Sequence, residues 1–99
     1  MTKSEIIDLI ANGTGLTKIE TEAVVNGFIA IVAQGLKEEK NIEIRGFGSF
    51  KVQHRSGRRA RNPRTGEEVD IEPRYVPAFR PSREFREAVD EAAKRRRDA

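Results

Sequence analysis

The spacing of apolar residues changes near residue 40 of this chain, and that change limits the folds open to it. Before it, Val24, Phe28, Ile31 and Val32 recur at intervals that place them on one side of a helix. After it, apolar and polar residues alternate over 42–45, as they do in a half-buried strand. Helices followed by strands favour the α+β class, and 99 residues make a single domain at most.

The N-terminal part carries two helix start signals. Thr2 with Glu5, and Thr17 with Glu20, have the spacing of a capping box, in which the first residue caps the helix. The two predicted helices occupy, approximately, residues 3–12 and 18–38. Residues 1–40 are therefore expected to form a helical hairpin, which we assign to dimerisation because so short a chain buries only a modest core.

The next segment, residues 41–81, is expected to form a three-stranded antiparallel sheet. Gly46-Phe47-Gly48 supplies a tight turn between two stretches in which apolar and polar residues alternate. Pro77 and Pro81 indicate an edge position or the end of a strand, because proline cannot donate to a sheet ladder.

Residues 54–68 contain no large apolar side chain, so this stretch cannot be held by a core of its own. At its middle, 62–66 reads Asn-Pro-Arg-Thr-Gly, a strong turn signal with proline near the start and glycine at the end. Alternation returns over 69–72. The sequence therefore predicts a β-ribbon arm, about 54–74, that protrudes from the sheet and needs something to lie against.

The C-terminal part is expected to contain one short helix. Ser82 is a suitable N-cap, and Phe85 and Val89 fall on one face behind it. We expect this helix over 82–93, followed by a frayed basic tail over 94–99.

The charge is unevenly distributed. The whole chain has a net charge of +3, but residues 1–44 hold four basic and seven acidic side chains, a net −3. Residues 45–83 hold ten basic side chains, nine of them arginine, and four acidic ones, a net +6. Residues 84–99 balance at five of each sign. A basic segment of this kind points to a polyanionic partner, and arginine suits phosphate better than lysine does.

Several classes of protein do not fit the composition. Without cysteine there is no disulfide framework and no thiolate metal site, and the lone His54 is expected to be a surface strand residue. No apolar run approaches the roughly 20 residues of a membrane helix, and the N-terminus lacks the apolar stretch of a signal peptide. We expect a cytoplasmic protein without metal, cofactor, small-molecule substrate or membrane partner.

Three stretches carry a resemblance to a known family. They read IEIRGFGSF at 42–50, ARNPRTGEEV at 60–69 and YVPAFRP at 75–81. Together with the two N-terminal helices, they resemble the bacterial HU and integration host factor family over residues 1 to about 91. The pairing of a GFG turn with a later RNP-x-TG turn is specific, whereas either alone is weak. The Glu43-Ile44-Arg45 segment is more similar to the β subunit of integration host factor than to typical HU.

This sequence departs from the family pattern at a few positions. Ala60 and Ser82 stand where the family usually has glycine, and Ala60 bears on the flexibility of the arm. Glu43 is expected to hold Arg45 toward a base edge, as the similar pair does in integration host factor, but Asn41 stands where that network has another partner.

The resemblance implies a histone-like, nucleoid-associated protein that bends and compacts double-stranded DNA without catalysis. Two arms of an intertwined dimer grip one duplex through its minor groove, and Pro63 at each tip intercalates between base steps and kinks the helix. Roles in chromosome condensation, recombination, replication and transcription follow from the family. A homodimer is expected, and a heterodimer with a related subunit remains open.

The DNA-contacting residues that the resemblance and the arginine pattern imply lie on the arm and the body. On the arm they are Arg55, Arg58, Arg59, Arg61, Asn62, Pro63 and Arg64. Nearer the body they are Lys3, Arg45, Gly46, Ser49, Arg74 and Arg80. The expected dimer core consists of Phe28, Ile31, Val32, Phe47, Phe50 and Phe79.

Rival functions remain at this point. Glu68, Asp70 and Glu72 alternate on one predicted strand face, as carboxylates that bind Mg²⁺ in a nuclease do, although pairing with arginines across the ribbon explains them as well. The basic arm also suits an acidic protein. A helix-turn-helix reader is disfavoured because the hairpin is acidic. Pro63 also fits a simple turn role, and the phenylalanines fit base stacking less well than a core.

Overall fold

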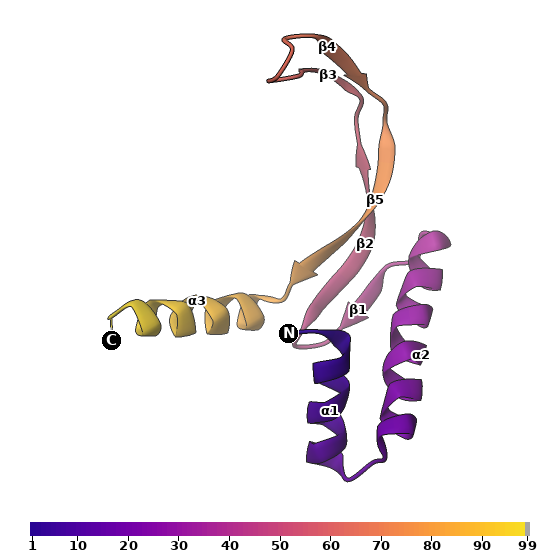
Figure 1. The fold of residues 1–99 in the computed structure, drawn as a ribbon, viewed down its shortest axis with the longest axis vertical. Helices are drawn as coiled ribbons and strands as arrows, with labels where there is room; N and C mark the ends of the chain where they lie inside the picture. The colour runs from indigo at the N-terminus through magenta and orange to yellow at the C-terminus, as the bar shows by residue number, and fades with distance from the viewer. Residues whose placement is uncertain (99) are drawn as a thin grey trace.

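The computed structural model describes residues 1–98 and has the expected α+β architecture (Figure 1). Its helices are α1 (Lys3–Thr14), α2 (Lys18–Lys37) and α3 (Arg83–Asp98). Its strands are β1 (Ile42–Ile44), β2 (Gly48–Arg55), β3 (Arg58–Arg61), β4 (Glu68–Ile71) and β5 (Arg74–Pro81). Figure 1 shows the hairpin of α1 and α2 at one end, a long curved ribbon leading away from it, and α3 extending in a third direction.

Both helix starts in the hairpin are capped as the sequence predicts. The Thr2 hydroxyl accepts a hydrogen bond from the Glu5 amide at 3.2 Å, and the Thr17 hydroxyl accepts one from the Glu20 amide at 3.1 Å. Each satisfies an amide that the helix leaves without a partner. The first helix continues two residues beyond the expected end because Gly15, with φ of 79°, supplies its left-handed C-cap.

The strands form two sheets. A three-stranded antiparallel sheet has the order β1-β2-β5, and a two-stranded antiparallel sheet consists of β3 and β4. β2 and β5 pair along eight positions, from Gly48 opposite Pro81 to Arg55 opposite Arg74. The ladder then stops, and β3 and β4 pair from Arg58 opposite Ile71 onward. The arm is thus an extension of the main sheet, interrupted once near its base.

Glycine is required at two places along this ribbon. A Cβ at Gly48 would lie 2.5 Å from the Arg80 carbonyl oxygen and 2.7 Å from the Phe79 ring. A Cβ at Gly57 would lie 2.8 Å from the Ile71 carbonyl oxygen, where the ladder is interrupted. At both positions the nearest atom is a backbone carbonyl oxygen, which cannot move aside as a flexible side chain does. The two strands of the ribbon therefore approach as closely as they do because these positions carry no side chain.

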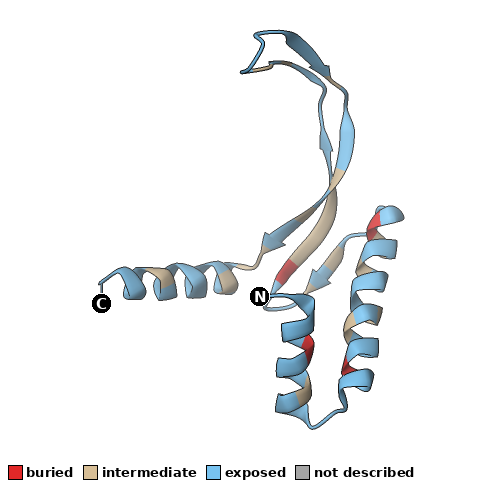
Figure 2. Ribbon diagram, in the orientation of Figure 1, coloured by how far each residue is buried: buried red, intermediate tan, exposed pale blue. Residues whose placement is uncertain are grey.

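The chain by itself has almost no core. Ile7 and Leu36 are the buried apolar side chains of the described residues, at 4% and 9% exposure, and Figure 2 shows the arm and α3 largely exposed. The radius of gyration is 19.0 Å, whereas a compact chain of this length has one of about 13 Å. Large apolar residues stay accessible on the helices and the sheet, so the fold leaves apolar surface for a partner subunit to cover.

The expectation that no apolar stretch approaches the length of a membrane helix was too strong for α2. This helix is long and apolar enough to meet the length and composition criteria for a membrane span, although it holds no uninterrupted apolar run of that length. The core helix of a soluble protein meets the same criteria. Here Phe28, Val32 and Leu36 of α2 line a groove with the sheet, whereas Val24 and Ile31 are 66% and 73% exposed.

α3 is longer than the sequence predicts. It runs to Asp98, so the basic residues 94–97 lie within the helix and do not form a frayed tail. Ion pairs between residues four apart, such as Asp90 with Lys94 and Glu91 with Arg95, support the added turns. These pairs are readable in the sequence once the helix is allowed to continue past residue 93.

Candidate nucleic-acid interface

The outer part of the arm has two different faces. Strand alternation puts Arg59 and Arg61 on one face, opposite Asp70 and Glu68 respectively in the β3–β4 register. The other face is partly apolar and holds Ala60 opposite Val69, with Arg58 at its end. Positive charge on the first face therefore meets negative charge on the neighbouring strand, which the composition of the segment does not reveal.

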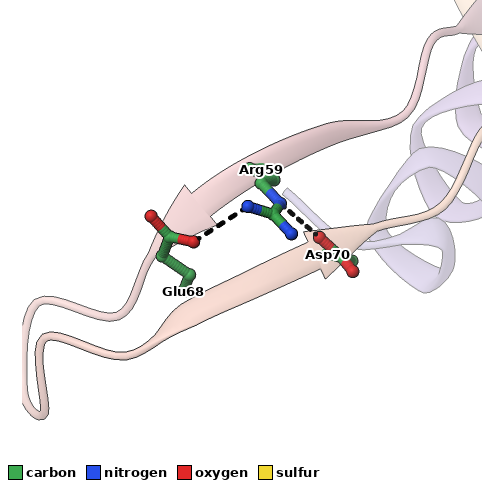
Figure 3. Close-up of polar contacts among 3 residues, drawn as sticks. All are labelled: Arg59, Glu68 and Asp70. Atoms are coloured by element: carbon green, nitrogen blue, oxygen red, sulfur yellow. Dashed lines mark hydrogen bonds and ion pairs between the residues drawn. The ribbon is translucent and has the colours of Figure 1, made fainter.

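Arg59 is held by two carboxylates at once (Figure 3). Its Nη1 atom donates to Glu68 Oε2 at 3.1 Å, and its Nε atom donates to Asp70 Oδ1 at 3.1 Å. All three side chains are more than half exposed, so these ion pairs are worth little stability in water. Their effect is on charge, because Arg59 is neutralised locally whereas Arg58, Arg61 and Arg64 have no ion-pair partner among residues 1–98.

The same geometry disfavours the magnesium site. Glu68 and Asp70 lie on β4, but Glu72 lies past its end, so the three carboxylates do not share a strand. Within residues 1–98 there is no group of three or more acidic, histidine or cysteine side chains that could hold a metal ion. Glu68 and Asp70 instead pair with an arginine across the ribbon, which is the alternative that the sequence offered.

The tip of the arm is a tightly bonded turn. The Asn62 side-chain oxygen accepts from the Arg64 amide at 2.9 Å, and the Gly66 amide donates to the Asn62 carbonyl at 2.8 Å. The Asn62 amide donates to the Glu67 carbonyl at 2.8 Å and closes the turn. Gly66 has φ of 76°, which favours glycine. Pro63 sits exposed inside this turn, and the bonds around it hold its ring at the end of the arm.

A cluster of cations surrounds the interruption at the base of the arm. Arg55, Arg58 and Arg74 line a hollow of about 490 Å³ together with His54 and Glu72. The His54 ring also packs on Tyr75, its neighbour across the sheet, with ring centroids 5.0 Å apart. His54 is thus a surface strand residue, as expected. Three guanidinium groups around one hollow, with one carboxylate among them, form a site suited to a phosphate group.

A second polar hollow lies where the sheet meets α3. Arg45, Gly46, Ser49 and Arg80, four of the residues expected near the body, line this space of about 320 Å³ with Glu43. Strand register explains the grouping, because Glu43 pairs with Ser49 and Ser49 pairs with Arg80 across three neighbouring strands. We call this hollow the body pocket.

Ser82 fixes one wall of the body pocket, a role that its helix-capping position alone does not predict. Its hydroxyl donates to the Gly46 carbonyl at 3.1 Å and accepts from the Phe85 amide at 3.1 Å. Its own amide donates to the Phe47 carbonyl at 2.9 Å. Ser82 therefore ties the Gly46 turn, where φ is 81°, to the start of α3.

Lys3 lies apart from these two hollows, at the start of α1. Its ammonium group donates to the Asn26 side-chain oxygen on α2 at 2.9 Å. Because the partner is a neutral amide, the positive charge of Lys3 is positioned but not cancelled.

Five of the six residues expected in the dimer core fall into two groups. Phe28, Val32 and Phe50 line an apolar groove of about 600 Å³ between α2 and the sheet. Phe79 packs against Phe47 and Phe50, with ring centroids 5.0 and 4.8 Å away.

Ile31 and Phe85 stand apart from these two groups, each in a different way. Ile31 is 73% exposed in the single chain and does not line the groove, because it lies on another side of α2, so its place in the dimer core stays a prediction. Phe85, which the sequence reading assigned only to the face of the last helix, stacks on Phe47 at 5.1 Å and joins the aromatic cluster.

Sequence comparison identifies known proteins that are similar to this chain over most of its length. Residues 1–90 match the model of the family described as bacterial DNA-binding protein. The chain is 44% identical to the integration host factor subunit beta of Marinobacter nauticus over 96% of this chain and 98% of that protein. It is 46% identical to the subunit of the same name from Vibrio cholerae, over 91% of this chain and 99% of that one.

Solved structures show the same fold. A cocrystal structure of Anabaena HU with DNA superimposes with a TM-score of 0.83 and 34% identity, covering 90% of this chain and 97% of that chain. A mutant HU from Thermotoga maritima superimposes with a TM-score of 0.68 and 27% identity, covering 90% of this chain and 99% of that one. The resemblance read from the GFG and RNP-x-TG turns is confirmed, and this chain belongs to the bacterial DNA-binding protein family of HU and integration host factor.

Proposed function

We propose that this chain is an architectural protein of the nucleoid, which binds double-stranded DNA as a dimer and bends it. The observation that carries the proposal is the arm, a projecting ribbon whose Arg58, Arg61 and Arg64 are exposed and unpaired within residues 1–98. A two-stranded ribbon fits a DNA groove, and guanidinium groups are attracted to the negative potential of a narrow minor groove. Membership of a DNA-binding family and likeness to an HU that was crystallised with DNA support this partner.

The contacts divide between the arm and the body. The arginines at the base of the arm and along β3 contact the DNA phosphates and the minor groove. Asn62 fixes the turn at the tip of the arm. The body pocket, with Arg45, Gly46, Ser49 and Arg80 around it, takes a phosphate farther along the same duplex. Arg59 takes part only after its ion pairs with Glu68 and Asp70 are exchanged for phosphate.

Pro63 acts as the intercalating residue. Its ring is rigid, exposed and held by the bonded turn at the end of the arm, which suits insertion between base steps. Minor-groove proteins that insert such wedges kink the duplex, and the energy lost in unstacking is offset by a longer contact with the bent DNA.

The protein acts as a dimer because a single chain leaves its apolar groove open. Phe28, Val32 and Phe50 would stay in contact with water in a monomer, and a second copy of the chain, with the same exposed apolar residues, would cover them. The same surface suits a related subunit. The relatives bear the name of a subunit of integration host factor, which is consistent with either assembly.

The activity is binding and not catalysis. Two of the three carboxylates that suggest a nuclease, Glu68 and Asp70, pair with Arg59, and the described residues hold no cluster of metal-ligating side chains to supply the cation such chemistry needs. Incubation of supercoiled plasmid with the protein and Mg²⁺ or Mn²⁺ tests this point. Accumulation of nicked or linear plasmid, absent with the Glu68→Gln variant, would restore the nuclease hypothesis.

Energy transfer between the labelled ends of a duplex, recorded at two salt concentrations, tests the main proposal. Binding should bring the ends closer, and affinity should fall steeply with salt as phosphate counterions are released. The double variant Arg61→Gln/Arg64→Gln should bind more weakly with a shallower salt slope, whereas Lys18→Gln/Lys40→Gln in the hairpin should not. Absence of salt-sensitive binding to any duplex would favour an acidic protein as the partner of the arm.

A further inference from the structure

The last turn of α3 carries the densest positive charge in the chain. Lys94, Arg95, Arg96 and Arg97 follow one another, and four consecutive residues encircle a helix that has 3.6 residues per turn. A stripe of charge that merely keeps one side of a helix in water would occupy one face only. Whichever side of α3 packs against a partner subunit, some of these cations still face solvent.

Local interactions use only part of this charge. Lys94 pairs with Asp90 at 3.0 Å and Arg95 pairs with Glu91 at 2.8 Å, in exposed pairs that add little stability. Arg97 donates to the Ala93 carbonyl, four residues earlier on the helix, at 3.1 Å. Arg96 has no carboxylate partner within residues 1–98. Such weak pairs are readily exchanged for a phosphate.

The position of this turn sets it apart from the sites already described. α3 begins beside the body pocket at Ser82 and leads away from both the arm and the hairpin (Figure 1). Arg96 lies fourteen residues later, about 21 Å along the helix axis, which is the length of about six base pairs of duplex. The turn also lies beyond residue 90, where the match to the family model ends.

We propose that Lys94–Arg97 form an additional contact with the phosphate backbone of the bound DNA, outside the segment held by the arms and the body pocket. This inference rests on the proposed function, and it names duplex DNA flanking the bend as the ligand of α3. The contact lengthens the occupied site on each side and adds affinity without adding sequence preference, because phosphates carry no base information.

Two variants with the same change of charge test the proposal in the full-length protein. Arg96→Gln/Arg97→Gln removes two cations from the turn and keeps good helix formers there, and Lys18→Gln/Lys40→Gln removes two exposed cations from the hairpin. Each is titrated with two duplexes over a range of salt. One is the shortest duplex that binds a single dimer, found by a length series, and the other is longer by about 12 base pairs.

The expected result is specific to the long duplex. There, Arg96→Gln/Arg97→Gln should lower the slope of log affinity against log salt by about two relative to the wild type, since each phosphate contact contributes about one. On the short duplex this variant should match the wild type, and the hairpin control should match it on both. Circular dichroism verifies that the variant keeps its helix content.

Two results would overturn the inference. One is an equal slope for wild type and variant on the long duplex. The other is an equal loss on both duplexes or on heparin, which would indicate general attraction to polyanions. Failure of the proposed function looks different, because the wild type would then not bind the short duplex at all.

Discussion

Arg59 and Asp70 face each other across β3 and β4, and the guanidinium Nε of Arg59 donates to the Asp70 carboxylate at 3.1 Å while its Nη1 reaches Glu68. The arm therefore carries less available positive charge than a count of its arginines suggests. Because the pairs are exposed, they cost little to break, and DNA competes for Arg59 with two carboxylates that are already in place.

Removing those carboxylates should strengthen binding. We expect Glu68→Gln/Asp70→Asn to raise affinity for duplex DNA about three- to tenfold at low salt, since exposed pairs of this kind are worth about 0.2–1 kcal/mol each. The salt slope should steepen by about one as Arg59 gains a phosphate. Glu22→Gln/Glu38→Gln makes the same change of charge in the hairpin, where Glu38 pairs with Lys40. An equal gain in that control would mean that net charge alone is responsible.

Replacing the proline at the tip should separate bending from binding. Pro63→Ala removes the rigid ring from a turn that Asn62 and Gly66 still hold together. We expect most of the kink at each arm to disappear, with an affinity loss of less than about tenfold because the arginine contacts remain. End-to-end energy transfer measures the bend, and Thr65→Ala serves as the neighbouring control. An unchanged bend angle would show that Pro63 only shapes the turn.

Truncating an aromatic in the apolar groove should weaken the dimer. Phe28 is 50% exposed in the single chain, and its burial by a partner makes Phe28→Ala cost about 3 kcal/mol or more, at least a hundredfold in the dimer dissociation constant. Val69 on the arm has a similar exposure of 47%, so Val69→Ala is the matched control. Sedimentation velocity over a dilution series measures the dimer dissociation constant of both variants. A dimer unaffected by Phe28→Ala would place the interface elsewhere.

Two glycine substitutions should change stability in opposite directions. Gly48→Ala puts a methyl group 2.5 Å from the Arg80 carbonyl oxygen, and we expect it to destabilise the fold by about 1–3 kcal/mol. Gly13→Ala lies in α1 with nothing within 4 Å, so it should stabilise by about 0.4–1 kcal/mol. Urea unfolding at one fixed protein concentration compares the two. A neutral Gly48→Ala would mean that the strands can separate at this point without cost.

Local sequence determined most of the architecture. Two capping boxes, the change of apolar period near residue 40 and the polar stretch around Asn62-Pro63 are sufficient for the hairpin, the sheet and the arm, because each signal acts between residues a few positions apart. The distribution of arginine indicated a polyanionic partner for the same reason. The end of α3 was placed too early because a run of cations is typical of a tail, although pairs such as Asp90 with Lys94 support a helix.

Tertiary structure decided which charges are free and which residues share a site. Arg59 and Arg61 look alike in the sequence, yet only the pairing register of β3 with β4 gives Arg59 its two carboxylates. The body pocket likewise brings Arg45 and Arg80 together across neighbouring strands, and Phe85 reaches Phe47 only through the path of the chain. Such contacts join residues far apart in sequence, and their distances depend on strand register and chain packing, which no local pattern of residues specifies.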